Sequence, residues 1–135
     1  MAPIAAPRIA PLRWSYSLVG GSGFALAAVG VLTSVFADSV ELKTFFLAVG
    51  CFGIHLHAGA WWGVNSIIGG PHSGTTFAFI NTAGVFTGAT AQVGFGAIPR
   101  EHWGNSFLIC ATLLAIGSVC WYFVDPNKTI ADRDA

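Results

Sequence analysis

The sequence predicts an all-α membrane protein with four transmembrane helices, and its composition and the spacing of its charges carry this prediction. Hydrophobic residues make up 54% of the 135 residues and charged residues only 9%, whereas soluble domains carry roughly 25% charged residues. Residues 14–37, 44–99 and 102–124 contain no Asp, Glu, Lys or Arg. A helix of about 20 apolar residues crosses the hydrocarbon core of a bilayer. The first and last stretches therefore each hold one span, and the middle stretch is long enough for two.

The middle stretch is interrupted by "GGPHSG" at residues 69–74. Proline removes a backbone donor and glycine favours a turn, so we place a break there. The predicted helices are 14–37, 43–69, 74–98 and 102–124, which together form a transmembrane domain over 14–124. Residues 1–13 are predicted to be a cytoplasmic N-terminal segment and residues 125–135 a cytoplasmic tail.

The first of these helices is expected to be retained rather than cleaved as a signal peptide. Its apolar run covers residues 14–37, which is longer than a signal-peptide core of roughly 7–15 residues. The only stretch that resembles a cleavage site, "ALAA" at 25–28, lies in the middle of the run.

The basic residues predict the orientation of these helices. Four spans place both termini on one side, which holds Arg8, Arg13, Lys128 and Arg133, while the other side holds Lys43 and Arg100. The positive-inside rule then places both termini in the cytoplasm, and we expect a multi-pass protein of a bacterial inner membrane. Trp14, Trp103 and Trp121 lie near predicted helix ends, where aromatic belts form.

The third predicted helix carries small and polar residues along one stripe. At 100° per residue the stripe contains Gly74, Ala78, Asn81, Gly84 or Val85, Gly88 and Gln92. Helices in lipid associate through close packing and hydrogen bonds, and an unpaired amide in hydrocarbon is costly. We therefore expect this helix to lie inside a bundle, with Gly74, Gly84 and Gly88 as helix-packing residues. Asn81 either joins two helices by a hydrogen bond or faces a substrate path.

The second predicted helix has a polar stripe of its own. His57, Trp61 and Asn65 are spaced four residues apart, so they lie on one helix face. A tryptophan with polar neighbours at mid-membrane depth can bind a ligand, although simple packing is the alternative. The candidate substrate-cavity residues are Trp61, Asn81, His57, Asn65 and Gln92.

The sequence contains no motif of catalysis or metal binding. There is no GxSxG, P-loop or HExxH pattern and no pair of intramembrane carboxylates, so we expect no enzymatic activity. Cys51 and His55 are four residues apart but lack a third ligand nearby, so we expect no metal site. We expect no cofactor; the alternative is a haem or chlorophyll-type macrocycle with His55 or His57 as axial ligand. A net charge of zero gives no indication of a nucleic-acid partner.

Two segments carry a resemblance to a known family. They are "WWGVNSIIGGPHSGTTFAFINTAGVFTGATAQVGFG" and "WGNSFLICATLLAIGSVCWYFVDPNKTI". Together they resemble the C-terminal end of a major facilitator superfamily transporter, most closely the anion:cation symporter branch, which carries organic anions such as sugar acids. Gly74, Asn81, Gly84 and Gly88 match the glycine and asparagine pattern of one family helix, and Trp103, Trp121 and the "DPNK" tail also fit.

The resemblance covers about residues 12–130 and implies that the four helices correspond to helices nine to twelve of such a transporter. The expected architecture is thus a partial major-facilitator fold with both termini cytoplasmic. In this branch a tryptophan of helix ten and the asparagine of helix eleven line the substrate cavity, and Trp61 and Asn81 occupy those positions. The resemblance implies transmembrane transport of an organic anion.

Two departures from the family qualify this expectation. Where the family often has a proline in the second half of helix eleven, this chain has "ATAQVG". The chain is also only about a third of a transporter and lacks the N-terminal half with which the C-terminal half alternates. It is therefore expected to be truncated or partial, and a single copy is not expected to transport by alternating access.

A second hypothesis is an accessory or scaffold subunit of a larger membrane complex, respiratory or photosynthetic, that no longer transports. On this hypothesis the stripe of Gly84 and Gly88, or the "GGSG" face at 20–23, docks on another protein, on pigment or on lipid. The expected partners under both hypotheses are the lipid bilayer and other protein chains, either in a homo-oligomer or in a larger complex.

Overall fold

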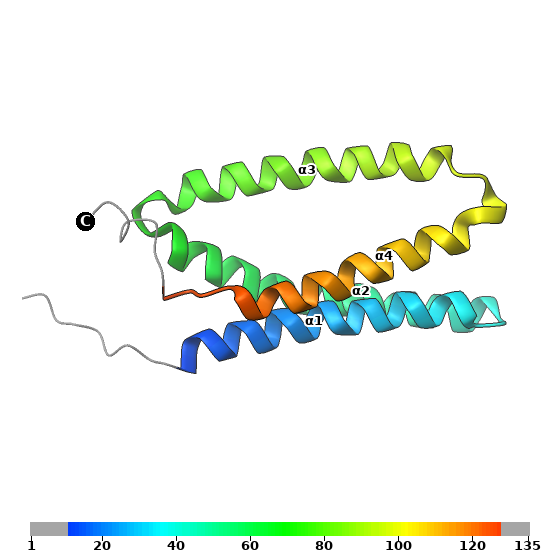
Figure 1. The fold of residues 1–135 in the computed structure, drawn as a ribbon, viewed down its shortest axis with the longest axis horizontal. Helices are drawn as coiled ribbons and strands as arrows, with labels where there is room; N and C mark the ends of the chain where they lie inside the picture. The colour runs from blue at the N-terminus through cyan, green and yellow to red at the C-terminus, as the bar shows by residue number, and fades with distance from the viewer. Residues whose placement is uncertain (1–10, 128–135) are drawn as a thin grey trace, which may run out of the picture.

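The computed structural model describes residues 11–127, and these residues are helical with short connections (Figure 1). The α-helices of this part of the chain are α1 (Pro11–Phe36), α2 (Val40–Gly69), α3 (Ser73–Ala97) and α4 (Trp103–Cys120). A 3-10 turn, η1 (Gly70–His72), follows α2. Two others flank α4: η2 (Arg100–His102) precedes it and η3 (Trp121–Phe123) follows it. The all-α class is therefore confirmed. Most of the predicted N-terminal segment and tail, including Arg8, Lys128 and Arg133, lies outside the described residues.

Local chemistry determines where the helices begin and end. Helix α2 begins after Ser39, whose hydroxyl oxygen accepts a hydrogen bond from the backbone N–H of Leu42 at 3.2 Å. It ends at Gly70, which adopts a φ of 47° that favours glycine and donates its N–H to the carbonyl of Ser66. Helix α3 ends before Ile98, which is extended because the next residue, Pro99, disfavours helical backbone there.

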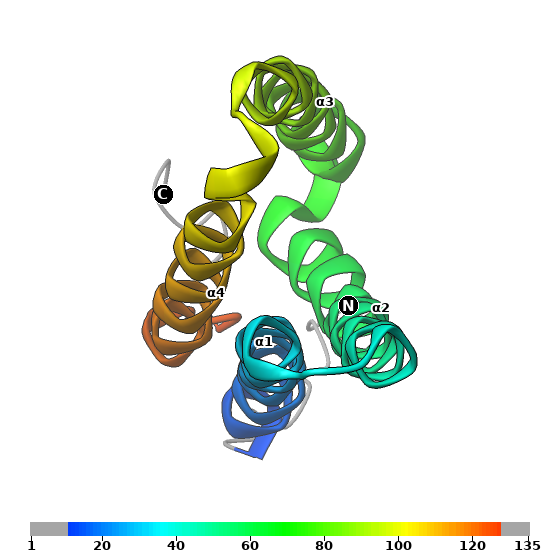
Figure 2. The ribbon, with the colours of Figure 1, turned by 90° about the vertical axis from the view of Figure 1, so that its right-hand side faces the viewer.

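Helix α1 is the centre of the packing. It runs along both α2 and α4, whereas α3 contacts α2 and stands apart from α1 (Figures 1 and 2). The described chain ends, at the start of α1 and after η3, lie at one end of the bundle, and the α1–α2 and α3–α4 connections lie at the other (Figure 1). A hydrogen bond from the Arg13 guanidinium to the carbonyl of Tyr122, at 3.3 Å, joins the chain ends.

Glycine allows α1 and α2 to approach backbone to backbone. A Cβ atom on Gly23 would lie 2.7 Å from the carbonyl oxygen of Gly53, and one on Gly30 would lie 2.7 Å from the backbone nitrogen of Gly50. These distances are shorter than a side chain tolerates, so only glycine fits at these crossing points. Close approach of this kind maximises the van der Waals contact that holds helices together in lipid.

The packed core lies near the end of the bundle that holds the described chain ends. Its buried members are Ala60, Val64 and Trp121, and the rings of Tyr16 and Phe24 pack against them. The prediction that Trp121 belongs to an aromatic belt is wrong, because its side chain is only 7% exposed. The indole lies over Gly20, where a Cβ would overlap the ring, so a small residue on α1 has made room for it.

A hydroxyl joins α4 to α1. The Ser118 Oγ donates a hydrogen bond to the carbonyl of Gly21 at 2.8 Å. We expect Ser118→Ala to lower the free energy of unfolding by about 0.6 kcal/mol, and by no more than about 1.7 kcal/mol, the range measured for interhelical hydrogen bonds in a membrane protein. The measurement is unfolding of the purified chain in detergent. Thr112→Ala is the control, since the Thr112 hydroxyl bonds only to Leu108 of its own helix, and an equal effect of both changes would contradict the prediction.

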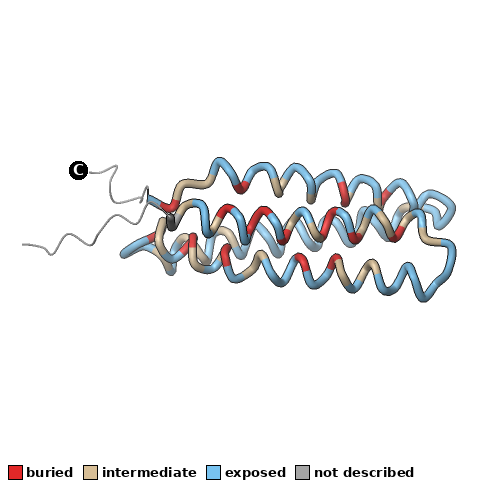
Figure 3. Tube along the Cα trace, turned by 90° about the horizontal axis from the view of Figure 1, so that it is seen from below, coloured by how far each residue is buried: buried red, intermediate tan, exposed pale blue. Residues whose placement is uncertain are grey.

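Three stretches of the described chain are long and apolar enough to cross a membrane: Arg13–Phe36, Val40–Ala97 and Arg100–Phe123. The second has 58 residues and contains both α2 and α3 with the turn between them. Much of the tube in Figure 3 is exposed, and large apolar side chains such as Phe79, Phe86 and Phe123 are at least 75% exposed. Monomeric soluble proteins rarely expose so much contiguous apolar surface. Length, composition and exposure together indicate a membrane protein.

Candidate functional site

The polar stripe of α2 is directed at the packed core rather than at an open cavity. The imidazole of His57 is half-buried, with its ring centroid 4.3 Å from that of Phe24 on α1 and 6.1 Å from that of Trp121. Asn65 is 9% exposed, and its Nδ2 donates to the carbonyl of Trp61 one turn earlier, at 2.9 Å. Both side chains thus have structural contacts in this chain. Trp61 is the member of the stripe that extends toward α3.

Aromatic rings connect α2 to α3. The centroid of the half-buried Trp61 ring lies 4.9 Å from that of Trp62 and 5.7 Å from that of Phe77 on α3. Trp62 stacks on the same phenylalanine, with centroids 4.8 Å apart and planes 29° apart. The sequence predicted a substrate-cavity or packing role for Trp61, but it left Trp62 without a role and did not single out Phe77. The position of Phe77 in the sequence could have indicated this contact. Phe77 lies one turn before Asn81, at the start of the helix that follows Trp62 across a tight turn.

Helix α3 is exposed along its length, so the expectation that it lies inside the bundle is wrong for a single copy of the chain. No residue of α3 is buried, and both Asn81 and Gln92 are exposed. A Cβ atom on Gly74, Gly84 or Gly88 would meet no atom within 4 Å. The physical reason is that α1 has α2 and α4 on its two sides, while α3 has only α2 beside it. Close packing on these glycines therefore requires helices that one copy does not supply.

Asn81 lines an open hollow on the surface of α3. The hollow has a volume of about 380 Å³, and its other lining residues are Thr82, Val85, Phe86 and Ala89. All of them belong to α3, so Trp61 does not line this hollow. The structure places Trp61 and Asn81 on neighbouring helices that meet at Phe77, without a hollow that both of them line here.

The "GGSG" face of α1 is occupied within the chain. Gly20 lies under Trp121, a Cβ on Gly21 would lie 3.4 Å from the carbonyl oxygen of Ser118, and Gly23 abuts Gly53. The expectation that this face docks on a partner, pigment or lipid is therefore wrong, because α2 and α4 cover it.

The two membrane histidines have similar hydrogen bonds and different surroundings. The Nδ1 of His55 lies 2.8 Å from the carbonyl oxygen of Cys51, and the Nδ1 of His57 lies 2.7 Å from that of Ile54. A carbonyl can only accept, so each Nδ1 carries a proton and Nε2 is the atom left for a ligand. His55 is exposed, whereas His57 packs on Phe24, so a macrocycle fits His55 better. Residues 11–127 contain no group of three potential metal ligands.

Comparisons with known proteins found no relative of this chain. The chain matches no protein-family profile, no curated protein and no solved structure.

Proposed function

We propose that this chain is a multi-pass membrane protein of transporter ancestry, equivalent to part of a major-facilitator-type organic-anion transporter, with four spans formed by α1 to α4. The observation that carries the proposal is the exposure of α3. Its amides and glycines are exposed beside a packed group of α1, α2 and α4. Polar residues in a membrane helix normally face a bundle interior or a water-filled path. A helix with this stripe therefore belongs against further helices, as expected for a fragment of a larger bundle.

In this proposal Asn81 and Trp61 belong to the substrate path once α3 is covered, with Gln92 farther along the same stripe. Asn81 offers an amide donor to an anionic substrate, and Trp61 offers a flat apolar surface one helix away. The membrane is a bacterial inner membrane and the termini are cytoplasmic. The four-to-two distribution of basic residues supports this orientation.

The same exposed helix favours a second candidate function, which is a non-transporting accessory or scaffold subunit of a larger membrane complex. Here the stripe of Gly84 and Gly88 packs against a helix of another protein, and the two amides find partners across that interface. The two candidate functions differ in the surroundings of Asn81. In the transporter it faces water and substrate, whereas in the accessory subunit it contacts another protein.

The first experiment is gentle detergent extraction of the natively expressed protein followed by native mass spectrometry. A chain that runs alone or as a homo-oligomer supports the transporter proposal. Stoichiometric association with larger, different chains contradicts that proposal and supports the accessory subunit.

Uptake then tests the role of Asn81. We expect Asn81→Ala to lower uptake of an organic anion about tenfold, because a hydrogen bond to a charged group is worth roughly 1.5–3 kcal/mol. Radiolabelled sugar acids and small carboxylates in proteoliposomes provide the measurement. Thr87→Ala is the matched control, since the Thr87 hydroxyl bonds to Ala83 within its own helix and Thr87 does not line the hollow. Equal uptake by Asn81→Ala and the unmodified protein would refute the proposed role.

A further inference from the structure

A cavity with a single cation lies at the end of the bundle that holds the α1–α2 and α3–α4 connections. Its volume is about 290 Å³, and residues of α1, α2 and α4 line it. Val35, Leu47 and Phe107 supply apolar walls, and Lys43 and Trp103 also line the cavity. Lys43 is the fourth residue of α2, so it lies close to the end of a membrane-spanning stretch.

A second cavity shares part of its wall with the first. It has a volume of about 240 Å³, it shares Trp103 and Phe107 with the first cavity, and its remaining walls include Phe95 and Gly96 at the end of α3. Its exposed lining is almost entirely apolar. The linings of the two cavities together contain one cation, Lys43, and apolar side chains that include the shared Trp103 and Phe107.

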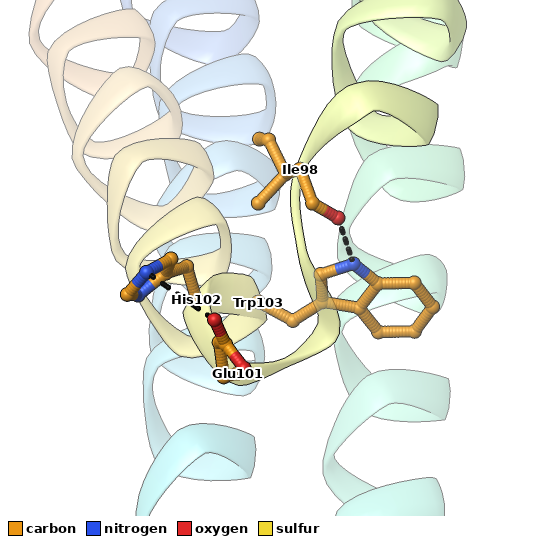
Figure 4. A network of polar contacts seen from close by, with 4 residues as sticks. All are labelled: Ile98, Glu101, His102 and Trp103. Atoms are coloured by element: carbon orange, nitrogen blue, oxygen red, sulfur yellow. Dashed lines mark hydrogen bonds and ion pairs between the residues drawn. The ribbon is translucent and has the colours of Figure 1, made fainter.

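The tryptophan between the cavities is held in position. Its Nε1–H donates to the carbonyl of Ile98 at 3.2 Å, across the connection from α3 to α4 (Figure 4). The indole is 47% exposed, with its donor directed at the connection. Tryptophan held in this way at a helix end is typical of the interface between acyl chains and headgroups.

The charges at this end leave Lys43 without a counter-ion. Glu101 lies 4.0 Å from His102 (Figure 4), and Lys43 forms no ion pair with any residue in the described part of the chain. The carboxylates nearest in sequence, Asp38 and Glu41, do not line the cavity. An ammonium group in the lining of a largely apolar cavity is complementary to an anionic headgroup joined to acyl chains.

From this arrangement we infer that the chain binds an anionic phospholipid at this end. The phosphate contacts Lys43, and an acyl chain lies along Trp103 and Phe107. The apolar lining selects a lipid over free phosphate, although both carry the same anionic group. This inference requires a membrane location but does not depend on transport. Lipid binding can therefore fail while the proposed function holds, and the proposed function can fail while lipid binding holds.

The test is native mass spectrometry of the full chain in detergent, with phosphatidylglycerol, phosphatidylcholine and inorganic phosphate as separate probes. We expect phosphatidylglycerol to be retained about fivefold more than phosphatidylcholine, the preference that one interfacial lysine provides. Lys43→Gln should abolish the preference and Lys43→Arg should keep it. Arg100→Gln is the matched control, because Arg100 is an exposed cation at the same end that does not line the cavity.

A cavity-filling variant tests the location independently of charge. Gly104 lines the first cavity, and a Cβ there would meet no atom within 4 Å, so Gly104→Leu adds an apolar side chain at the cavity wall. We expect it to remove most bound phosphatidylglycerol, whereas Gly84→Leu on open α3 should not. Equal retention of both lipids by the unmodified protein overturns the inference without any variant. Displacement of phosphatidylglycerol by inorganic phosphate also overturns it, in favour of a free-anion site.

Discussion

Gly53→Leu is expected to separate helix α1 from helix α2 and to cause a large loss of stability. A Cβ at this position would lie 2.6 Å from the carbonyl oxygen of Gly23 and 2.7 Å from the backbone nitrogen of Ala27. Both atoms belong to the backbone of α1, so no side-chain rotation relieves the overlap and the helices must move apart. We expect a loss of at least about 3 kcal/mol, the upper end of the usual cost of overpacking.

The measurement is unfolding of the purified chain in detergent, with the proportion of monodisperse protein as a second readout. Gly59→Leu is the matched control on the same helix, because a Cβ on Gly59 would meet no atom within 4 Å. The control also removes the general effect of replacing a helical glycine. If both variants unfold alike, the close crossing of α1 and α2 is wrong.

Trp121→Ala is expected to have an effect of similar size. Trp121 is 7% exposed, and it packs on Ala60 and Val64 of α2 and over Gly20 of α1. Its removal leaves a cavity that the rigid helix backbones around it cannot fill, at a cost of roughly 3–5 kcal/mol. His57 also loses its edge-to-face neighbour, since the two ring centroids are 6.1 Å apart. Unfolding in detergent measures the loss.

Phe123→Ala is the control for the tryptophan change. Phe123 lies two residues later in the same 3-10 turn and is 80% exposed, so its removal should change stability little. Trp121→Phe should restore part of the loss because it refills part of the space. If the Trp121→Ala protein is as stable as the Phe123→Ala protein, the indole faces lipid, as the prediction of an aromatic belt requires.

The uncovered α3 relates the fold to both candidate functions. Its first turns contact α2 through the rings of Trp61, Trp62 and Phe77, while residues 81–97 of the helix are exposed. Lipid can cover the exposed phenylalanines of α3, but it offers no hydrogen bond to Asn81 or Gln92. We therefore expect the covering partner to supply polar groups opposite these two amides, whether that partner is a second copy or a different chain.

Composition and local signals were sufficient for the helical class and the membrane environment. The absence of charge over three long stretches is a property of consecutive residues, and each stretch is long enough by itself to cross a bilayer. The turn at Gly70 and Pro71 was predictable for the same reason, because glycine and proline act on their own backbone. Neither inference needs any knowledge of which helices meet.

The packing partners were decided only by the tertiary structure. Small residues on a stripe predicted close packing for Gly84 and Gly88. The glycines in backbone contact are instead on α1 and α2, where Gly23 meets Gly53 and Gly30 meets Gly50. Trp121 likewise has the spacing of an interfacial residue and is instead the largest side chain of the buried cluster. A glycine shows where a backbone can come close, but whether one does depends on the helix that stands opposite. That helix is set by the arrangement of all the spans together, with α1 between α2 and α4 and α3 beside α2 alone.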